Sequence, residues 1–375
     1  MRNITKSLGV LSAAAFAVVV SGASVGPVAF GEAAAQTIGG FPIVEPNKNR
    51  GVANGKKKTK EEDKPTQIVV DANGSGPYTT ISKALKDIGE GGIIYVLHGE
   101  YRESLNLTKS VYIQGDRGPG SGVEILAELD QPCLMFEPEK KRSGAHAVVA
   151  NVRLISRVGS GAPACVDVRE GVFTMKESNV RGSKPDEVLS RKVDGLDTDG
   201  KPAIRVSGGV ALLEKNHITK GSVGVMIKQN HTLSQSMIVD NKIDNNTVGI
   251  DLSGRADVIV AGNDIFDNLE TGIISDGLGG ATVIGNKIRN NSGNGIILHK
   301  NAKISLLRYN RIVQNGQNGV FIPLGAPGVI EGNEIVGNGG RAIFFTETGI
   351  RPKVINNVFQ NNKGDKRRGG LFSGN

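Results

Sequence analysis

The sequence contains no tryptophan, and aromatic side chains of all kinds make up only 4% of its 375 residues. Together with 52 glycines, this composition disfavours a globular α/β core and favours a chain that turns many corners. The five histidines show no metal-ligand spacing, and no serine or cysteine stands in a recognisable arrangement with a histidine base. We therefore expect no metal, no cofactor and no nucleophile of the Ser-His or Cys-His type.

Long apolar runs are missing after the first 29 residues, so we expect no transmembrane segment in the mature chain. Residues 1–35 resemble a secretory signal peptide in layout, with basic Arg2 and Lys6, an apolar run over residues 8–20 and a small-residue cleavage site at Ala35 or Ala23. The alternative is an uncleaved anchor, which interrupting glycine and proline residues disfavour. The expected localisation is secreted or periplasmic.

The formal charge of +8 lies mostly near the ends of the chain. Residues 36–66 are polar and aperiodic, and we expect a basic disordered linker there, with a basic tail over residues 363–375. Residues 67–362 carry only +1, and we expect them to form one domain without a specific nucleic-acid site. The basic ends could associate with anionic polysaccharide, membrane surface or nucleic acid, or serve only as solvated tethers.

A repeat occupies the second half of the chain, as in "VIGNKIRNNSGNGIILHK" over residues 283–300. Its template is an apolar pair, an asparagine, another residue and an isoleucine, followed by a second asparagine and then a small residue before an alternating apolar run. The first asparagine recurs every 22 to 25 residues, at Asn216, Asn241, Asn263, Asn286, Asn310, Asn333 and Asn357. The second recurs at Asn246, Asn268, Asn291, Asn315, Asn338 and Asn362. Such a period predicts a solenoid, because one repeat is too small to bury its own apolar face.

Apolar residues alternate with others over short runs, which indicates strands instead of helices. A leucine-rich repeat would carry several leucines at fixed spacing, and these are absent. The sequence therefore predicts an all-β parallel β-helix of about ten coils, with inward isoleucine and valine columns. We expect the asparagines to adopt left-handed corners and to stack in structural columns, with glycine at the remaining crowded or positive-φ corners.

The segment "QIVVDANGSGPYTTISKALKDIGEGGIIYVLHGEYRESLNLTKSVYIQGD", residues 67–116, resembles the opening of pectin methylesterases and other members of the pectin lyase-like superfamily. This resemblance implies a right-handed β-helix. The same stretch places Ile81, Ala84, Leu85 and Ile88 on one helical face. We therefore expect a helix near residues 80–88 that caps the first coil.

The catalytic motifs of the superfamily are absent. "GNDIFDN" at residues 262–268 only approximates the aspartate motif of pectin methylesterases and fits an ordinary repeat, while "DTDG" at 197–200 lacks the further aspartate pair and Gly-His-Gly of polygalacturonase-like hydrolases. The Asp-Pro-His signature of mannuronan epimerases is also missing. The resemblance therefore carries no catalytic residue over to this chain.

An outward row can still be found by aligning the strand that follows each small corner residue. The third and fifth positions of this strand should face outward. The charged members of the row are Asp167, Arg169, Arg205, Lys228, Asp251, Asp276 and His299, and the apolar members are Ile274, Ile297, Phe321 and Phe344. We expect Asp167, Arg169, Arg205, Lys228, Phe321 and Phe344 to form a substrate-binding groove for an acidic polysaccharide.

Asp251 and Asp276, with His299 beside them, are the candidate catalytic residues. One coil and two residues apart, the carboxylates should be separated by about 8 Å, within the range of inverting glycoside hydrolysis. A merely solvated face is the alternative. A neighbouring column, at Lys242, Asp264, Lys287, Arg311 and Glu334, alternates in sign and predicts a surface charge ladder.

Two features interrupt the pattern. An acid-rich insertion separates Asn179 from Asn216, and it could either overhang the groove or form a surface excursion. Cys133 and Cys165 occupy one template position on adjacent coils, so their Cα atoms should lie about 4.8 Å apart. Parallel Cβ directions disfavour a bridge between them, and the sequence leaves their redox state open.

Two functions follow from these patterns. The first is a secreted or periplasmic protein that binds, and cleaves or modifies, an acidic polysaccharide. The second is a non-catalytic envelope scaffold or adhesin that uses the solenoid as a spacer. The sequence decides neither the catalytic activity nor the oligomeric state.

Overall fold

A computed structural model describes residues 37–38, 41–42, 64–74, 76–117, 122–139, 144–157, 161–184, 201–228, 235–255, 257–277, 279–299, 305–346 and 350–365. The chain divides into two compact units, residues 1–57 and 58–375. In the first, β1 (Thr37–Ile38) pairs with β2 (Phe41–Pro42) in antiparallel fashion. The expected signal peptide and basic tail, and most of the expected linker, lie outside the described residues.

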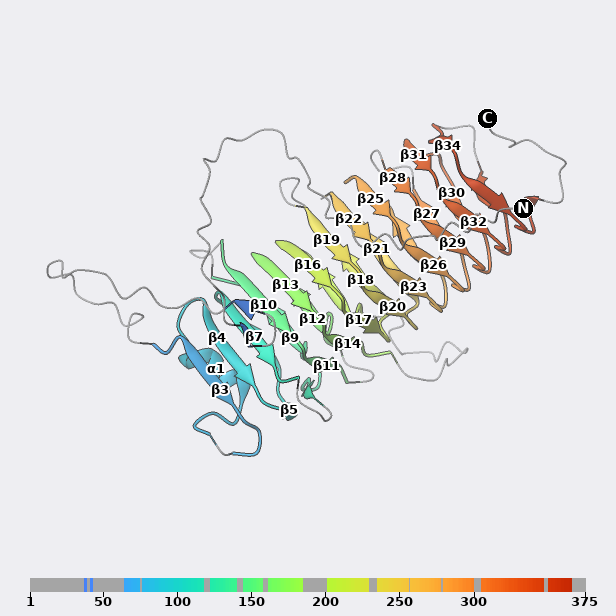
Figure 1. Cartoon of the computed structure of the whole chain (residues 1–375). Coiled ribbons are helices and arrows are strands. Elements are labelled where there is room, and N and C mark those ends of the chain that lie inside the picture. Colours follow the sequence, from blue (N-terminus) through green and yellow to red (C-terminus); the bar gives the residue numbers. More distant parts are fainter. Residues whose placement is uncertain are drawn as a thin grey trace, which may run out of the picture. The chain divides into compact units, whose positions relative to one another are not determined.

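The second unit is a parallel β-helix (Figure 1). Each complete coil contributes one strand to each of three parallel sheets, which we call sheets I, II and III in the order that the chain visits them. Sheet I has twelve strands, β3 (Gln67–Val70), β4 (Gly92–Val96), β7 (Val111–Gly115), β10 (His146–Ala150), β13 (Val172–Lys176), β16 (Val210–Glu214), β19 (Ser236–Val239), β22 (Val258–Ala261), β25 (Ala281–Ile284), β28 (Ser305–Arg308), β31 (Gly328–Glu331) and β34 (Lys353–Ile355).

Sheets II and III follow the same coil order. Sheet II has eleven strands, β5 (Gly99–Arg102), β8 (Val123–Leu126), β11 (Arg153–Ile155), β14 (Asn179–Arg181), β17 (His217–Thr219), β20 (Lys242–Asp244), β23 (Asp264–Phe266), β26 (Lys287–Arg289), β29 (Arg311–Val313), β32 (Glu334–Val336) and β35 (Val358–Gln360). Sheet III has ten, β6 (Leu105–Leu107), β9 (Leu134–Phe136), β12 (Val166–Val168), β15 (Ile204–Val206), β18 (Val223–Ile227), β21 (Val248–Leu252), β24 (Ile273–Ser275), β27 (Ile296–Leu298), β30 (Val320–Ile322) and β33 (Ile343–Phe345). The prediction of about ten coils is confirmed.

The one helix among the described residues, α1 (Ile81–Asp87), covers the N-terminal end of the solenoid. The Thr80 hydroxyl accepts a hydrogen bond from the Lys83 amide as the N-cap, and Ile88 is the C-cap, so the predicted boundaries are confirmed. Ile81 and Ile88 are completely buried against the first coils. The Glu103 carboxylate accepts hydrogen bonds from the Ile81 and Ser82 amides, which satisfies orphan donors of the first turn.

Both asparagine columns form as predicted. Asn286 accepts hydrogen bonds at Oδ1 from the backbone and side-chain nitrogens of Asn263, and its own Nδ2 donates to Oδ1 of Asn310 at 3.0 Å. Asn291 repeats this pattern between Asn268 and Asn315 in the second column. The side chains are about as buried as the aliphatic core, so each column holds adjacent coils in register.

The left-handed corners do not lie where the sequence predicted them. The residue before each column asparagine, and not the asparagine itself, has positive φ, as at Asp240 (54°), Gly262 (66°) and Tyr309 (53°). The column position instead needs a side chain that points inward and spans the corner. Glycine also occupies crowded corners as expected, because a Cβ on Gly249 would meet the carbonyl oxygen of Gly272 at 2.4 Å.

The start of the first column differs by one residue from the sequence alignment. Ser178, and not Asn179, occupies the position before Asn216, whose Oδ1 accepts the Ser178 amide at 3.0 Å. Asn179 pairs in sheet II with His217. The asparagine was misaligned because serine takes the column position in this coil. Most of the insertion that follows lies outside the described residues.

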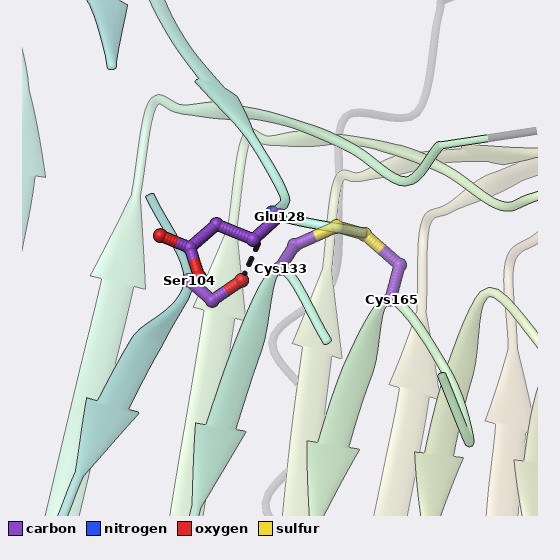
Figure 2. Close-up of a disulfide and its surroundings, with 4 residues drawn as sticks. All are labelled: Ser104, Glu128, Cys133 and Cys165. Carbon is purple, nitrogen blue, oxygen red and sulfur yellow. Dashed lines mark hydrogen bonds between the residues drawn. A yellow bond between two sulfur atoms is a disulfide. The ribbon is translucent and has the colours of Figure 1, made fainter. Parts of the chain in front are cut away.

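The structure contains a disulfide between Cys133 and Cys165, with a Cα separation of 4.8 Å as predicted (Figure 2). The expectation that parallel Cβ directions would disfavour the bridge is wrong. Both cysteines come immediately before their strands, β9 and β12, at a corner where the side chains need not follow the strand pleat. The bond therefore joins two early coils, in which neither asparagine column has begun.

Candidate functional site

The outer face of sheet III carries every residue of the predicted outward row. The strands bury alternate residues, as in β21, where Ile250 and Leu252 are buried and Asp251 between them is half-buried. Register places the third-position residues in one column, Met135, Asp167, Arg205, Met226, Asp251, Ile274, Ile297, Phe321 and Phe344. Arg169, Lys228, Asp276 and His299 follow just after their strands.

Asp167 is an outward residue without exposed surface. Its carboxylate accepts hydrogen bonds from Nε and Nη2 of Arg205 at 2.8 and 2.9 Å, and from Nε of Arg169 at 2.8 Å. Arg169 also bonds Glu137 at 2.8 Å. We call these four residues the Asp167 cluster. The two guanidinium groups cover the carboxylate completely, so Asp167 orients them and does not itself face solvent.

The members of the Asp167 cluster that were predicted to bind substrate differ in whether a ligand can reach them. Asp167 is inaccessible to a ligand, whereas Arg169 is exposed and Arg205 keeps 29% of its side-chain surface. The guanidinium groups are already engaged with carboxylates of the chain itself. They are therefore held in place, with part of their donor capacity used.

The Asp251 cluster lies farther along the same face and consists of Lys228, Asp251, Asp276 and His299. The pairing of Asp251 with Ile274 places Asp276 one coil and two residues from Asp251, which is the arrangement behind the predicted carboxylate spacing. His299 is the next residue of the Asp276 column, since its amide donates to the Ser275 carbonyl. Lys228 occupies this column two coils before Asp276.

Burial raises the pKa of Asp251 above its ordinary value, and the charge of Asp276 acts in the same direction. Ser253, Lys228 and His299 oppose this shift without cancelling it. The Ser253 hydroxyl, which acts on Asp251 in this sense, is itself buried. Asp276, in contrast, is exposed. Two nearby carboxyl groups therefore occupy different environments, as an acid and base pair requires.

Apolar side chains continue the face beyond the Asp251 cluster. Ile274 and Ile297 are half-buried and lead to Phe321 and Phe344. The two phenyl rings stack with centroids 5.6 Å apart and an interplanar angle of 15°. The guanidinium of Arg341 lies 4.8 Å from the Phe344 ring centroid. The face thus passes from charged groups to a partly exposed pair of aromatic rings.

Two charged pairs on sheet II were not predicted, although Asp264 was expected there as a member of the charge ladder. His217 bonds Asp244 at 2.9 Å, and Asp264 forms two hydrogen bonds with Arg289, which also lies 4.0 Å from the Phe266 ring centroid. Although burial opposes the change, hydrogen bonds from His217 and Asn245 lower the pKa of Asp244. The alternation of polar residues around each isoleucine of "KIDN", "DIFD" and "KIRN" was the available signal.

The predicted charge ladder is correct in position and only partly correct in pairing. Arg311 bonds Glu334 on the next coil at 3.3 Å, as a ladder requires. Asp264 instead pairs with Arg289, because the longer arginine reaches diagonally across one coil. Among the described residues, no group of three or more His, Cys, Asp or Glu side chains is arranged to hold a metal ion. The helix of the described segments is too short to cross a membrane.

Comparison with solved structures places this architecture among known β-helices. The A-module of the mannuronan C-5 epimerase AlgE4 of Azotobacter vinelandii is similar with a TM-score of 0.52 and 15% identity over 75% of this chain and 89% of that chain. The Dettilon tailspike protein gp208 is similar with a TM-score of 0.50 and 13% identity over 78% of this chain and 59% of that chain. At these identities the likeness concerns the fold alone.

No curated protein matches the chain in sequence. The family described as "Right handed beta helix region" matches residues 169–327 and 233–372, which together span more than half of the chain. This match agrees with the observed solenoid and with the expected hand of its coils. The chain belongs to the right-handed β-helix family.

Proposed function

We propose that the outer face of sheet III binds an acidic polysaccharide and that the Asp251 cluster hydrolyses it. The observation that carries this proposal is the continuity of one sheet face from the Asp251 cluster to the stacked rings of Phe321 and Phe344. A polymer laid along the solenoid axis would contact cationic groups and apolar surface in sequence. Both kinds of contact suit uronate sugars, which combine a carboxylate with apolar ring faces.

Lys228, Arg169 and Arg205 are the proposed partners of the substrate carboxylates. Lys228 is exposed on its strand end, and the two arginines are oriented by Asp167. Phe321 and Phe344 would contact sugar faces. The partly used donors of Arg205 make Lys228 the stronger single contributor to binding.

Asp251 is the proposed general acid, because its raised pKa favours the protonated form. Asp276 is the proposed base that activates water, since it is exposed and its estimated distance of about 8 Å leaves room for that water. In this scheme Asp251 gives its proton to the leaving glycosidic oxygen as the bond to the anomeric carbon breaks. Water attacks that carbon and transfers a proton to Asp276, and His299 would orient Asp276.

The AlgE4 A-module is named a mannuronan C-5 epimerase, which makes uronate polymers the first substrates to test here. Secretion or periplasmic export fits such a substrate and follows from the signal-like residues 1–35. The decisive experiment is a glycan array followed by product analysis on alginate, pectate and hyaluronate. Binding without new reducing ends would rule out hydrolysis and support binding. No binding to any acidic glycan would rule out both the binding and the hydrolysis proposals.

A second candidate function is a non-catalytic envelope scaffold or adhesin. It is favoured by the Asp167 cluster, in which carboxylates of the chain itself already occupy both guanidinium groups. In this case the solenoid acts as a rigid spacer. Retained binding and adhesion in a variant that lacks both Asp251 and Asp276 carboxylates, with no product formed by either protein, would select this alternative.

A further inference from the structure

The outer face of sheet I carries an almost entirely apolar column. One outward position per strand aligns over ten successive strands from β4 to β31, and none of these positions holds a charged side chain. The column consists of Ile93, Tyr112, Val148, Thr174, Leu212, Met237, Ile259, Thr282, Leu306 and Val329. Met237 retains 36% of its accessible surface, and neighbouring Tyr95 and Val172 retain 39% and 38%.

On the same coils, the outer face of sheet II carries charged side chains instead of apolar ones. Its first outward column has an ionisable side chain on every strand from β17 to β32, namely His217, Lys242, Asp264, Lys287, Arg311 and Glu334. Both columns are built from the same repeat and have the same need for solubility. A long apolar column on one face alone is therefore a property of that face, and such contiguous patches mark interaction surfaces.

Four charged side chains that flank the apolar column are paired with one another, whereas Lys353 on β34, which follows Val329 in the column itself, is exposed. Lys176 lies 3.7 Å from Glu214, and Nε of Arg308 lies 2.8 Å from a carboxylate oxygen of Glu331, all within the second outward column of sheet I. Between these pairs the second column continues with Val239, Ala261 and Ile284. Along the strands from β13 to β31, a partner for this face thus needs no excess charge of either sign.

We infer that the outer face of sheet I is the interface with a second copy of this chain. The ten strands of the column at about 4.8 Å and four to five residues at about 3.3 Å give a face of about 45 by 15 Å. Covering it would bury about 680 Å² on each copy, or about 1,350 Å² in total, which lies within the range of specific stable interfaces. Two such faces would pack as aligned sheets about 10 Å apart, related by a two-fold axis.

Other occupants fit less well. An anionic lipid surface selects unpaired basic side chains, whereas Lys176 and Arg308 are each paired with a glutamate. A glycan is recognised by aromatic faces and polar donors, and from Leu212 to Val329 the column is aliphatic apart from Met237 and Thr282. A copy of the same face supplies a matching apolar column. Sheet III remains uncovered in this dimer, so the interface does not depend on the proposed polysaccharide function.

The test is sedimentation velocity of the full chain at about 50 µM, compared with two variants on the same coil. Ile259→Lys places an unpaired charge in the sheet I column, and Ile274→Lys, the matched control, makes the same change on the outer face of sheet III. We expect a dimer for the unmodified chain and the control. The Ile259→Lys variant should raise the dissociation constant by about two orders of magnitude.

Circular dichroism should show the same β content in all three proteins, because both isoleucines point out of the coil. Thr282→Lys, on the next strand of the same column, is a second variant that should also dissociate if Ile259→Lys misfolds. A monomeric unmodified chain, or a dimer that survives both sheet I substitutions as well as it survives Ile274→Lys, would overturn the inference. Binding of the unmodified monomer to lipid vesicles would overturn it in favour of a membrane surface.

Discussion

The carboxylate of Asp167, fully buried on a face that the strand pattern assigns to solvent, is held by two hydrogen bonds from Arg205, at 2.8 and 2.9 Å. Replacing both Arg205 and Lys228 with alanine should abolish binding to acidic glycans, because it removes two cations of the proposed groove. It should also lower the free energy of unfolding by about 3 kcal/mol, since Asp167 loses its bidentate partner.

Binding and stability are separated by measuring affinity on immobilised glycan together with urea denaturation. Lys228→Ala alone should weaken binding and change stability much less than the double variant, because Lys228 is exposed and acts on the half-buried Asp251 only through its charge. The matched control is the pair Lys287→Ala and Arg311→Ala on sheet II, which should leave affinity unchanged. Equal losses from the two double variants would show that binding follows diffuse charge instead of a site.

Asn286→Ala should destabilise the solenoid by about 1–3 kcal/mol, because donors and acceptors buried on both neighbouring coils lose their partner. Asn286 is only 1% exposed and bonds Asn263, Asn310 and the Val260 carbonyl. Chemical denaturation followed by circular dichroism measures the change. Lys287→Ala, one residue along and exposed, should change stability by less than about 0.5 kcal/mol. A similar loss at both positions would contradict a special role for the column.

The contribution of Asp251 to the free energy of unfolding should fall as the pH rises through the range in which carboxyl groups titrate. Its raised pKa means that the folded protein keeps a proton that the unfolded chain, with an ordinary pKa near 3.8, has already released. The stabilisation is complete below about pH 3.8 and is lost as the pH reaches the raised pKa. In Asp251→Asn this part of the pH dependence should disappear. Urea midpoints across pH 3 to 7 test it, and an unchanged slope in the variant would be the contrary result.

Hydrolysis should depend on Asp251 and Asp276 separately. Asp251→Asn and Asp276→Asn should each reduce the rate of reducing-end formation by about 100-fold or more, while glycan affinity changes little. The rate of the unmodified protein should fall at high pH as Asp251 loses its proton. Retained activity in both variants would show that another site catalyses the reaction. Product of retained anomeric configuration would rule out the inverting geometry.

The Cys133–Cys165 disulfide closes a separation of 32 residues, and for a loop of this length the chain-entropy estimate is a stabilisation of about 3 to 4 kcal/mol. The double variant Cys133→Ala and Cys165→Ala should therefore melt at a lower temperature. Alkylation and mass analysis of the untreated protein should find no reactive thiol. A reducing agent should lower the melting temperature of the unmodified chain and leave the double variant unchanged, whereas no effect on either protein would show that the bridge contributes nothing.

The sequence predicted the features that repeat. Each coil from Asn241 to Asn338 supplies an inward isoleucine and the same two asparagines, so an error in one coil is corrected by the others, and the columns through Asn286 and Asn291 formed as expected. The alignment failed at Ser178, where the repeat uses a different residue. The capping helix was predictable because Thr80 and the apolar face of residues 81–88 are local signals.

The arrangement of side chains within the outward row was less predictable. Pleat alternation places Asp167 outside the coil, but it says nothing of long neighbours that fold over it, and Arg169 and Arg205 remove it from solvent. For the same reason Asp264 pairs with Arg289 across a diagonal. Strand periodicity determines where a Cβ points, whereas the flexible ends of arginines determine which charges meet.

Because the coils stack in register, distances along the solenoid axis come in equal steps of one coil. Asp251 and Phe321 are joined through Ile274 and Ile297 in one column, with one residue per coil, so their spacing is a whole number of steps of about 4.8 Å. Deleting the coil from Asn286 to Tyr309 would leave both asparagine columns continuous and bring the phenyl rings one step closer to the carboxylates. The length of ligand that spans both groups is thus set by a count of coils, which gene duplication or deletion can change in whole units.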